Sequence, residues 1–219
     1  MIIAIDGTSS SGKTSIAKEL GNILNIPVLG TGAIYRAVAL KLYNASVKPT
    51  DNEKIKQILS TTSITTKYDN GKCIIFLDGL EEPDFVLHSP HISVYTPTIA
   101  VNPIIREFVR SIQHQEAEIH ENLIVEGRDI GSVVFPDANF KFFIDADIKA
   151  RAQRRLNDYT DQGKEFSLED VIKEIEHRDN QDRNREISPL LMTSDAHLID
   201  SSSCSAKACA LEIANIIKR

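Results

Sequence analysis

The chain has 219 residues, of which 42% are hydrophobic and 26% are charged. This length is long for one simple domain and short for two independent ones, so we expect one core with lobes inserted into it. The net charge of −6 argues against a basic surface for duplex nucleic acid. No apolar run approaches the ~18 residues of a membrane span, and the N-terminal region lacks the pattern of a signal peptide. We therefore expect a cytoplasmic protein that binds neither membrane nor nucleic acid.

Three cysteines stand at positions 73, 204 and 209. Their spacing matches no metal site, and an odd number leaves no complete set of disulfide pairs. Because thiols stay reduced in a cytosolic environment, the sequence predicts three free cysteines.

Short apolar runs alternate with helical patterns along the chain. This alternation is typical of a parallel sheet covered by helices on both faces, which makes the chain an α/β protein. The runs predict strands at 2–5, 26–29, 123–125, 140–144 and 197–200, and the helical patterns predict helices at 14–24, after 32 through 42, from about 103, and at the C-terminus.

Two stretches interrupt the alternation. Residues 50–95 contain a polar helix over 52–59 and then two strands, 63–68 and 73–77, joined by Asp69-Asn70-Gly71. Asn-Gly between two such runs favours a hairpin, so this region is predicted to be a small antiparallel insertion. Residues 147–186 are polar, helical and rich in arginine, which suits a mobile lobe over a cleft.

The segment after the first strand has almost nothing to bury. It matches the phosphate-binding pattern GxxxxGK[ST] and stands between a strand and a helix, as that pattern requires. Small residues allow successive backbone N–H groups to surround a phosphate, and the helix N-terminus favours negative charge. In this pattern Lys13 reaches the β and γ phosphates and Thr14 can ligate Mg²⁺. The expected ATP cradle consists of Gly7, Thr8, Ser9, Ser10, Ser11, Gly12, Lys13, Thr14 and Ser15.

Arginines are more numerous around the predicted crevice than one triphosphate requires. Arg36 and Arg128 follow predicted strands, whose carboxyl ends face the same crevice as the phosphate loop. Further arginines stand at 106, 110, 151, 154, 155, 178, 183 and 185. Since arginine binds phosphate in a bidentate manner, this excess predicts a second phosphorylated ligand.

Three blocks make the sequence similar to a known family. They are GAIYR at 32–36, EGRDIGSVVFPDA at 126–138 and RDNQDRNR at 178–185. The chain closely resembles bacterial cytidylate kinases, and the resemblance runs from Ile2 to the final helix. The second and third blocks are long and specific, which makes them stronger evidence than the phosphate loop alone.

The resemblance implies transfer of a phosphoryl group from ATP to CMP or dCMP, giving ADP and CDP or dCDP. It also implies a P-loop kinase core with a five-stranded parallel sheet of order 2-3-1-4-5, flanked by helices. By this likeness the core would cover residues 1–35, 104–146 and 187–219. A nucleoside-monophosphate lobe with the antiparallel insertion would cover 36–103, and a short helical lid 147–186.

The resemblance also implies a role for individual residues. Tyr35, Arg36, Arg128 and Arg185, with Thr31, would hold CMP and its phosphate, Arg106 and Asp129 would contact cytosine, Arg178 and Asp182 would contact the ribose, and Arg151, Arg154 or Arg155 would reach ATP. The cytosine pair also fits chemically, because the exocyclic amine needs an acceptor and the ring needs a donor. A uracil would face Asp129 with an acceptor, leaving a costly unpaired contact.

Four positions depart from the family pattern. Ser10 and Thr14 stand where the family commonly has glycine, and Thr14 brings the loop closer to the general phosphate-loop pattern. Glu126 replaces an aspartate that would help to order Mg²⁺ waters. Pro97 replaces a serine that contacts cytosine, so that contact is lost or moves to Thr96 or Thr98.

Other functions compete with this interpretation. A kinase for UMP, AMP, dTMP or a non-nucleotide would share the phosphate loop, and Pro97 keeps that alternative open. A nucleotide switch or ATPase would carry a guanine-reading NKxD segment or a water-positioning residue, and the sequence contains no NKxD. A nucleic-acid binder would interleave aromatic residues with the arginines, which the lobe at 147–186 does not do. We expect a monomer, because no exposed apolar helix face is evident.

Overall fold

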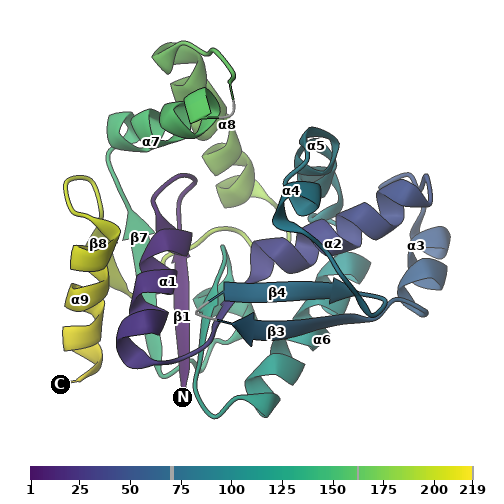
Figure 1. Ribbon diagram of the computed structural model, residues 1–219, viewed down its shortest axis with the longest axis horizontal. Coiled ribbons are helices and arrows are strands. Elements are labelled where there is room, and N and C mark those ends of the chain that lie inside the picture. The colour runs from purple at the N-terminus through teal and green to yellow at the C-terminus, as the bar shows by residue number, and fades with distance from the viewer. Residues whose placement is uncertain (70–71, 162, 219) are drawn as a thin grey trace. The chain divides into compact units, whose positions relative to one another are not determined.

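The structure is a computed structural model that describes residues 1–69, 72–161 and 163–218. The predicted Asn70-Gly71 turn lies outside these residues. The chain divides into two compact units, one formed by residues 1–26 with 124–219 and the other by residues 27–123. Both are α/β in composition (Figure 1).

The large sheet confirms the predicted α/β class with five parallel strands flanked by helices. Its strand order is β2-β6-β1-β7-β8. Strands β3, β4 and β5 form a separate sheet. When only the strands of the large sheet are numbered along the chain, its order is 2-3-1-4-5. The pairing of β1 with β7 and of β7 with β8 is parallel.

The first unit contains the phosphate loop and both ends of the chain. Its central strands are nearly all apolar because helices cover both faces of a parallel sheet. Helix α1 packs against α9, and α7 packs against α8. The elements are β1 (Ile2–Gly7), α1 (Lys13–Leu24), β6 (Leu123–Glu126, whose first residue belongs to the second unit), the π-helical turn η1 (Ile130–Val134), β7 (Phe140–Asp145), α7 (Ile148–Asp161), α8 (Leu168–Asn184), β8 (His197–Asp200) and α9 (Ala206–Ile217).

The second unit contains the predicted insertion. Strands β3 and β4 pair antiparallel, with Ile64 opposite Leu77 and Asp69 opposite Lys72, which confirms the hairpin pairing. The elements are β2 (Val28–Gly30), α2 (Thr31–Asn44), α3 (Asn52–Leu59), β3 (Ile64–Asp69), β4 (Lys72–Leu77), β5 (Leu80–Glu81), α4 (Asp84–Leu87), α5 (Pro90–Ile99) and α6 (Pro103–Ile119).

Helices α4 and α5 and strand β5 were not predicted from the sequence. Helix α5 carries Pro90 at its start and Pro97 in its interior, and proline normally interrupts a helix because it lacks the N–H donor. Buried Ile92 and Ile99 nevertheless anchor this helix in the core of its unit. Tertiary burial therefore outweighs the local sequence signal here.

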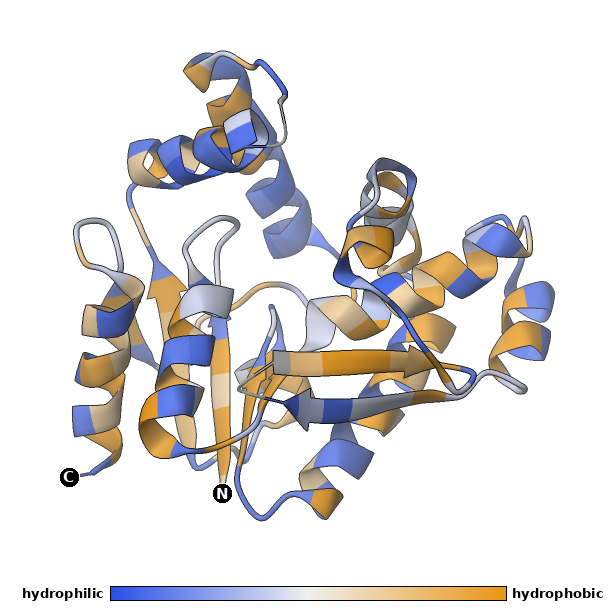
Figure 2. Cartoon of the chain, in the orientation of Figure 1, coloured by the Kyte–Doolittle hydropathy of each residue, from blue (hydrophilic) through white to orange (hydrophobic). Residues whose placement is uncertain are grey.

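The core of the first unit lies around β1 and β7. Ile3, Ile5 and Phe142 are fully or almost fully buried, and Ile16 and Leu20 of α1 are buried with them. Figure 2 shows the contrast between the apolar strands, in orange, and helix α8, which is largely blue. Helices α7 and α8 instead share a small apolar cluster of Ala152, Val171 and Ile175. Among the described residues, no helix is long and apolar enough to span a membrane.

Asp6, near the end of β1, holds the turn that follows β6. Its two carboxylate oxygens accept hydrogen bonds from the backbone N–H groups of Ile130, at 2.9 Å, and Gly131, at 2.7 Å. Burial raises the pKa of Asp6 to about 6, and the two backbone hydrogen bonds oppose this rise. The carboxylate thus fixes η1 next to Arg128 and Asp129 while being costly to ionise.

The raised pKa of Asp6 predicts a pH-dependent stability. The folded protein binds this proton up to about pH 6, whereas an unfolded aspartate releases it near pH ~4. The stabilisation is therefore complete below about pH 4 and is lost as the pH rises through 6. We expect the free energy of unfolding of wild type, relative to Asp6→Asn, to fall by roughly 2–3 kcal/mol between pH 4 and 7. Urea melts of both proteins measure this difference, and a difference independent of pH would contradict it.

Candidate active site

The phosphate loop has the backbone that its sequence predicts. Gly7 has φ 148°, and a Cβ atom there would lie 2.0 Å from the Ile144 carbonyl oxygen, so only glycine fits. Gly12, the N-cap of α1, has φ 85°. Ser10, where the family commonly has glycine, also lies in the left-handed region with φ 57°, a conformation that costs a serine about 1–2 kcal/mol. The loop therefore folds as a phosphate cradle despite this departure.

Lys13 lies inside the loop and is buried. Its Nζ donates to the Thr8 carbonyl oxygen, at 2.5 Å, and lies 3.5 Å from Ser11 Oγ. Burial lowers the pKa of Lys13 well below its ordinary value, and the Arg128 guanidinium lowers it further while Glu126 opposes both. A buried cation beside other cations is stabilised by an incoming anion, which is what a phosphate would supply.

Thr14 and Glu126 meet next to the loop. Thr14 Oγ1 donates to Glu126 Oε1 over 3.2 Å. Hydroxyl and carboxylate oxygens are hard ligands, and Mg²⁺ in phosphate sites typically takes one or two such protein ligands together with water and substrate oxygens. The pair therefore fits the predicted Mg²⁺ position, and the longer side chain of Glu126 reaches Thr14 directly.

Arg128 connects the phosphate loop to helix α8. Its Nε donates to Asp182 Oδ2 at 2.9 Å, and its Nη1 donates to the Gly7 carbonyl oxygen at 2.9 Å. Arg185 lies 3.5 Å from Asp182 and 3.6 Å from Asp129, which is itself buried. The structure thus brings together four of the predicted substrate residues within the first unit. Arg178 is close enough to lower the pKa of Lys13.

The predicted lid arginines have three different environments. Arg154 donates to the carbonyl oxygens of Ser11, at 3.3 Å, and of Ser201. Arg155 lies 3.4 Å from Glu174 and over the Tyr159 ring. Arg151 is buried and is bound by residues of its own unit, including an ion pair with Asp179. Arg151 also donates to the Ser9 carbonyl oxygen at 3.2 Å, so both Arg151 and Arg154 contact the phosphate loop, and the Arg154 side chain is only partly buried.

The second unit contains the other predicted substrate residues. The Arg106 guanidinium lies 5.8 Å from the centre of the Tyr35 ring and donates to the Ala100 carbonyl oxygen at 3.0 Å. Arg36 donates to Ser93 Oγ, at 3.0 Å, and to the Leu87 carbonyl oxygen, at 3.2 Å. Thr31 is buried at the start of α2. Within this unit, Arg106 therefore lies near the Tyr35 ring, and Arg36 is hydrogen-bonded to Ser93.

The two threonines beside Pro97 are engaged within their own helix. Thr96 Oγ1 donates to the Ile92 carbonyl oxygen at 2.6 Å, and Thr98 Oγ1 donates to the Tyr95 carbonyl oxygen at 2.7 Å. Each hydroxyl proton is therefore committed to the helix backbone, and only the oxygen lone pairs remain to accept from a ligand.

The prediction of three free cysteines is wrong for two of them. Cys204 and Cys209 form a disulfide, and Cys73 is free. Their Cα atoms lie 6.3 Å apart because the chain turns into the first turn of α9 between them, and this separation lies within the range that a disulfide spans. An odd number of cysteines leaves one thiol over and does not prevent the other two from pairing.

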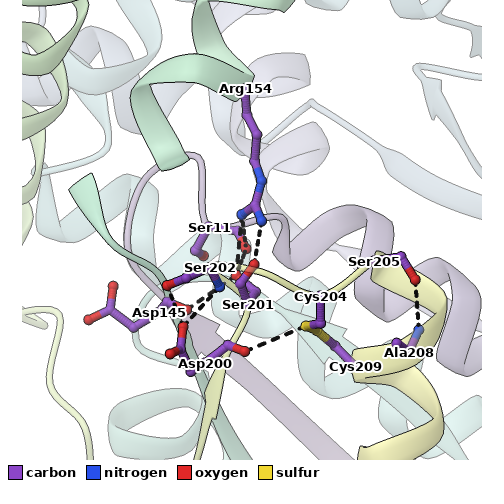
Figure 3. The surroundings of a disulfide bond; sticks show 10 residues. All are labelled: Ser11, Asp145, Arg154, Asp200, Ser201, Ser202, Cys204, Ser205, Ala208 and Cys209. Carbon is purple, nitrogen blue, oxygen red and sulfur yellow. Dashed lines mark hydrogen bonds between the residues drawn. A yellow bond between two sulfur atoms is a disulfide. The ribbon is translucent and has the colours of Figure 1, made fainter. Parts of the chain in front are cut away.

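The disulfide belongs to the loop that contacts the phosphate cradle. Figure 3 shows Ser201, three residues before Cys204, donating through Oγ to the Ser11 carbonyl oxygen at 2.7 Å. Arg154 contacts both Ser201 and Ser11. Ser205 caps α9 by accepting from the Ala208 N–H at 3.2 Å. The β8–α9 loop is thus part of the wall around the phosphate loop.

Breaking the disulfide is expected to lower stability moderately. A bridge between residues five apart closes a short loop, for which the chain-entropy model gives about 2 kcal/mol. We expect Cys204→Ser to lower the free energy of unfolding by about 2 kcal/mol under oxidising conditions. The same variant should match wild type when both are melted with a dithiol reductant, and Cys73→Ser serves as the control under both conditions. Equal stabilities of Cys204→Ser and wild type without reductant would contradict the bridge.

Sequence reasoning missed several residues of this site. Asp6, Asp145 and Ser201 contact the phosphate loop or the turn after β6, yet no motif signals them; Thr8 Oγ1, for example, donates to Asp145 Oδ1 at 2.7 Å. Asp179 lies inside the RDNQDRNR block, which carries the family resemblance, but the sequence analysis assigned no role to this residue. A search for buried carboxylates at strand ends would have pointed to Asp6.

Comparison with known proteins decides the family. The family model described as cytidylate kinase matches residues 3–219. The chain belongs to the cytidylate kinase family. A cytidylate kinase of Clostridium botulinum strain Langeland is 39% identical over 217 residues, covering 99% of this chain and 97% of the relative. One from Fervidobacterium nodosum is 38% identical over 220 residues, covering 99% and 95%.

Solved structures support the fold of this family member. An uncharacterized protein from Eubacterium ventriosum superposes with a TM-score of 0.57 at 14% identity, covering 100% of this chain and 98% of its own. A shikimate kinase from Bacteroides thetaiotaomicron gives 0.50 at 11% identity, covering 100% and 99%. At these identities the likeness concerns the fold alone.

Proposed function

We propose that this cytidylate kinase family member transfers the γ-phosphoryl group of ATP to CMP and dCMP, giving ADP and CDP or dCDP. The observation that carries the proposal is the family match over residues 3–219, together with a buried Lys13 inside a formed phosphate loop. Both substrates are small molecules, and we propose a monomeric, cytoplasmic enzyme.

The acceptor of this reaction is already an oxyanion, so no strong general base is required. Catalysis then consists of positioning the two substrates and neutralising the charge that develops on the transferred group. Lys13 would hold the β and γ phosphates, and Arg154, bound to the carbonyl oxygens of Ser11 and Ser201, would add positive charge on the lid side. Arg155 is the alternative lid arginine.

Mg²⁺ would be held by Thr14 with Glu126 acting directly or through water, and when bound it would supply charge neutralisation at the phosphates. The rest of the cradle uses backbone N–H groups of residues 7–15 at the N-terminus of α1. The lid, residues 147–186, would exclude water from the phosphoryl group and so limit hydrolysis of ATP.

The CMP site would be formed by the residues that the family motif implies. Arg36, Arg128, Arg185 and Tyr35 would bind the phosphate, with Thr31 beside them, Arg178 and Asp182 would bind the ribose, and Arg106 and Asp129 would bind cytosine. Asp182 is already paired with Arg128 and Arg185, so ribose hydroxyls would join an existing charge network.

We propose a core of residues 1–35, 104–146 and 187–219, with a nucleoside-monophosphate lobe at 36–103.

The test is product formation with and without acceptor. ATP and Mg²⁺ are incubated with CMP, with dCMP or with no acceptor, and nucleotides are separated by ion-exchange chromatography. We expect CDP or dCDP to appear in equal amount with ADP, and ADP formation to be negligible without acceptor or with excess EDTA. Loss of ATP at the same rate without acceptor would show an ATPase and overturn the proposal.

A further inference from the structure

A buried ion pair joins the lid to the phosphate loop. Asp179 of α8 is 4% exposed and forms an ion pair with Arg151 of α7. Its Oδ1 also accepts a hydrogen bond of 2.8 Å from the backbone N–H of Ser9. Arg151 in turn donates to the carbonyl oxygens of Ser9, at 3.2 Å, and Ala146, at 3.0 Å. The backbone of Ser9 is therefore held from both sides by one charged network.

The ion pair between Arg151 and Asp179 adds little net stability to the packing of α7 against α8. Removing two charges from water costs nearly as much as their attraction returns, so well-packed apolar residues would serve stability equally well. Helices α7 and α8 already share the apolar cluster of Ala152, Val171 and Ile175. What the pair adds is a fixed geometry between α8 and the phosphate loop, which apolar contacts do not specify.

Helix α8 also carries residues assigned above to CMP. Arg178 directly precedes Asp179, and Asp182 follows it by less than one turn. Asp182 binds Arg128, which donates to the Gly7 carbonyl oxygen. The phosphate loop is thus attached to the same helix at two points, through Ser9 and Asp179 and through Gly7 and Arg128. Any movement of the loop backbone on binding ATP is passed to the helix that presents Arg178 and Asp182.

We propose that Asp179 is a positioning residue that couples the ATP cradle to the CMP-binding residues of α8, so that each substrate strengthens the binding of the other. The inference rests on the proposed function. Coupling of this kind is reciprocal, because the free energy that ATP contributes to CMP binding equals the one that CMP contributes to ATP binding. A residue with only a structural role would lower stability without changing that coupling.

The experiment measures the coupling directly. The Kd of CMP is determined by titration calorimetry with and without saturating Mg²⁺ and the non-hydrolysable analogue β,γ-imido-ATP. We expect the analogue to tighten CMP binding to wild type about fivefold or more. In Asp179→Asn, which keeps an acceptor for the Ser9 N–H but loses the charge facing Arg151, the ratio should fall to about one. The matched control is Glu176→Gln, which changes an exposed carboxylate on α8 that, like Asp179, lines a polar cavity of about 400 Å³; it should keep the wild-type ratio.

A second variant tests the coupling in case Asp179→Asn does not fold. Arg151→Lys keeps the charge beside Asp179 but removes the guanidinium fork that also binds Ser9 and Ala146, and it should lower the ratio as well. If Asp179→Asn fails to melt cooperatively, the Arg151→Lys ratio decides. A wild-type ratio of one, or variants with the wild-type ratio, would overturn the coupling while leaving CMP binding intact. A wild type that binds no CMP would overturn the proposed function and this inference together.

Discussion

Replacing Lys13 by methionine is expected to lower kcat by on the order of 10³-fold. The Lys13 ammonium is buried inside the phosphate loop, where in P-loop enzymes it stabilises the charge on the β and γ phosphates. Methionine fills similar space without the charge. Initial rates of CDP formation at saturating ATP and CMP measure the effect.

The stability of Lys13→Met separates a chemical role from a structural one. Burial disfavours the charged form of Lys13 and lowers its pKa, so removing the charge should leave the melting temperature unchanged or raise it. Lys18→Met is the matched control, because Lys18 is an exposed lysine on the same helix. A Lys13→Met enzyme with a kcat within threefold of wild type would exclude the assigned role.

Replacing Arg128 by alanine is expected to lower kcat/KM for CMP by roughly 10²- to 10³-fold. Arg128 is a guanidinium fork held between Gly7 and Asp182, and its loss would also leave Asp182 with one cationic partner fewer. Arg128→Lys should recover little of the loss, because an ammonium cannot replace the bidentate geometry. Steady-state kinetics with varied CMP at saturating ATP measure both variants.

The control for Arg128 is Arg183→Ala, which removes an exposed arginine at the end of α8 and should keep kcat/KM within about twofold of wild type. An equal loss in both variants would point to general electrostatics in place of a specific clamp. An unchanged kcat/KM for CMP in Arg128→Ala would contradict the assignment of Arg128 to the CMP phosphate.

The strands and most helices could be predicted because their signal is local. Apolar runs placed β1, β6, β7 and β8 within about two residues of their observed bounds. The second strand was predicted at 26–29 but is found at 28–30. Asn25 ends α1 in the left-handed conformation, and the Ile26 N–H bonds back to Gly21, so the turn after the helix uses the residues that began the predicted strand. Apolar character alone does not reveal such a turn.

The functional site divides in the same way. The phosphate loop is contiguous in sequence, so a local pattern predicts its place between β1 and α1. The close approach of Gly7 to the Ile144 carbonyl oxygen was not predicted. The contact of Ser9 with Asp179 joins residues 170 apart, and no local pattern predicts it. The disulfide was missed for another reason. We expected free thiols because of the predicted cytoplasmic location and the odd number of cysteines, and neither argument tests whether residues 204 and 209 can pair.

Selection of cytosine over uracil is tested most directly by the ratio of kcat/KM for CMP to that for UMP. We expect a ratio of at least about 10², because a uracil would place an acceptor against Asp129 and leave a polar contact unpaired. dCMP should be a substrate as well, and AMP should be turned over slowly. Comparable kcat/KM values for CMP and UMP would keep the fold and the phosphoryl transfer but contradict cytosine recognition by Arg106 and Asp129.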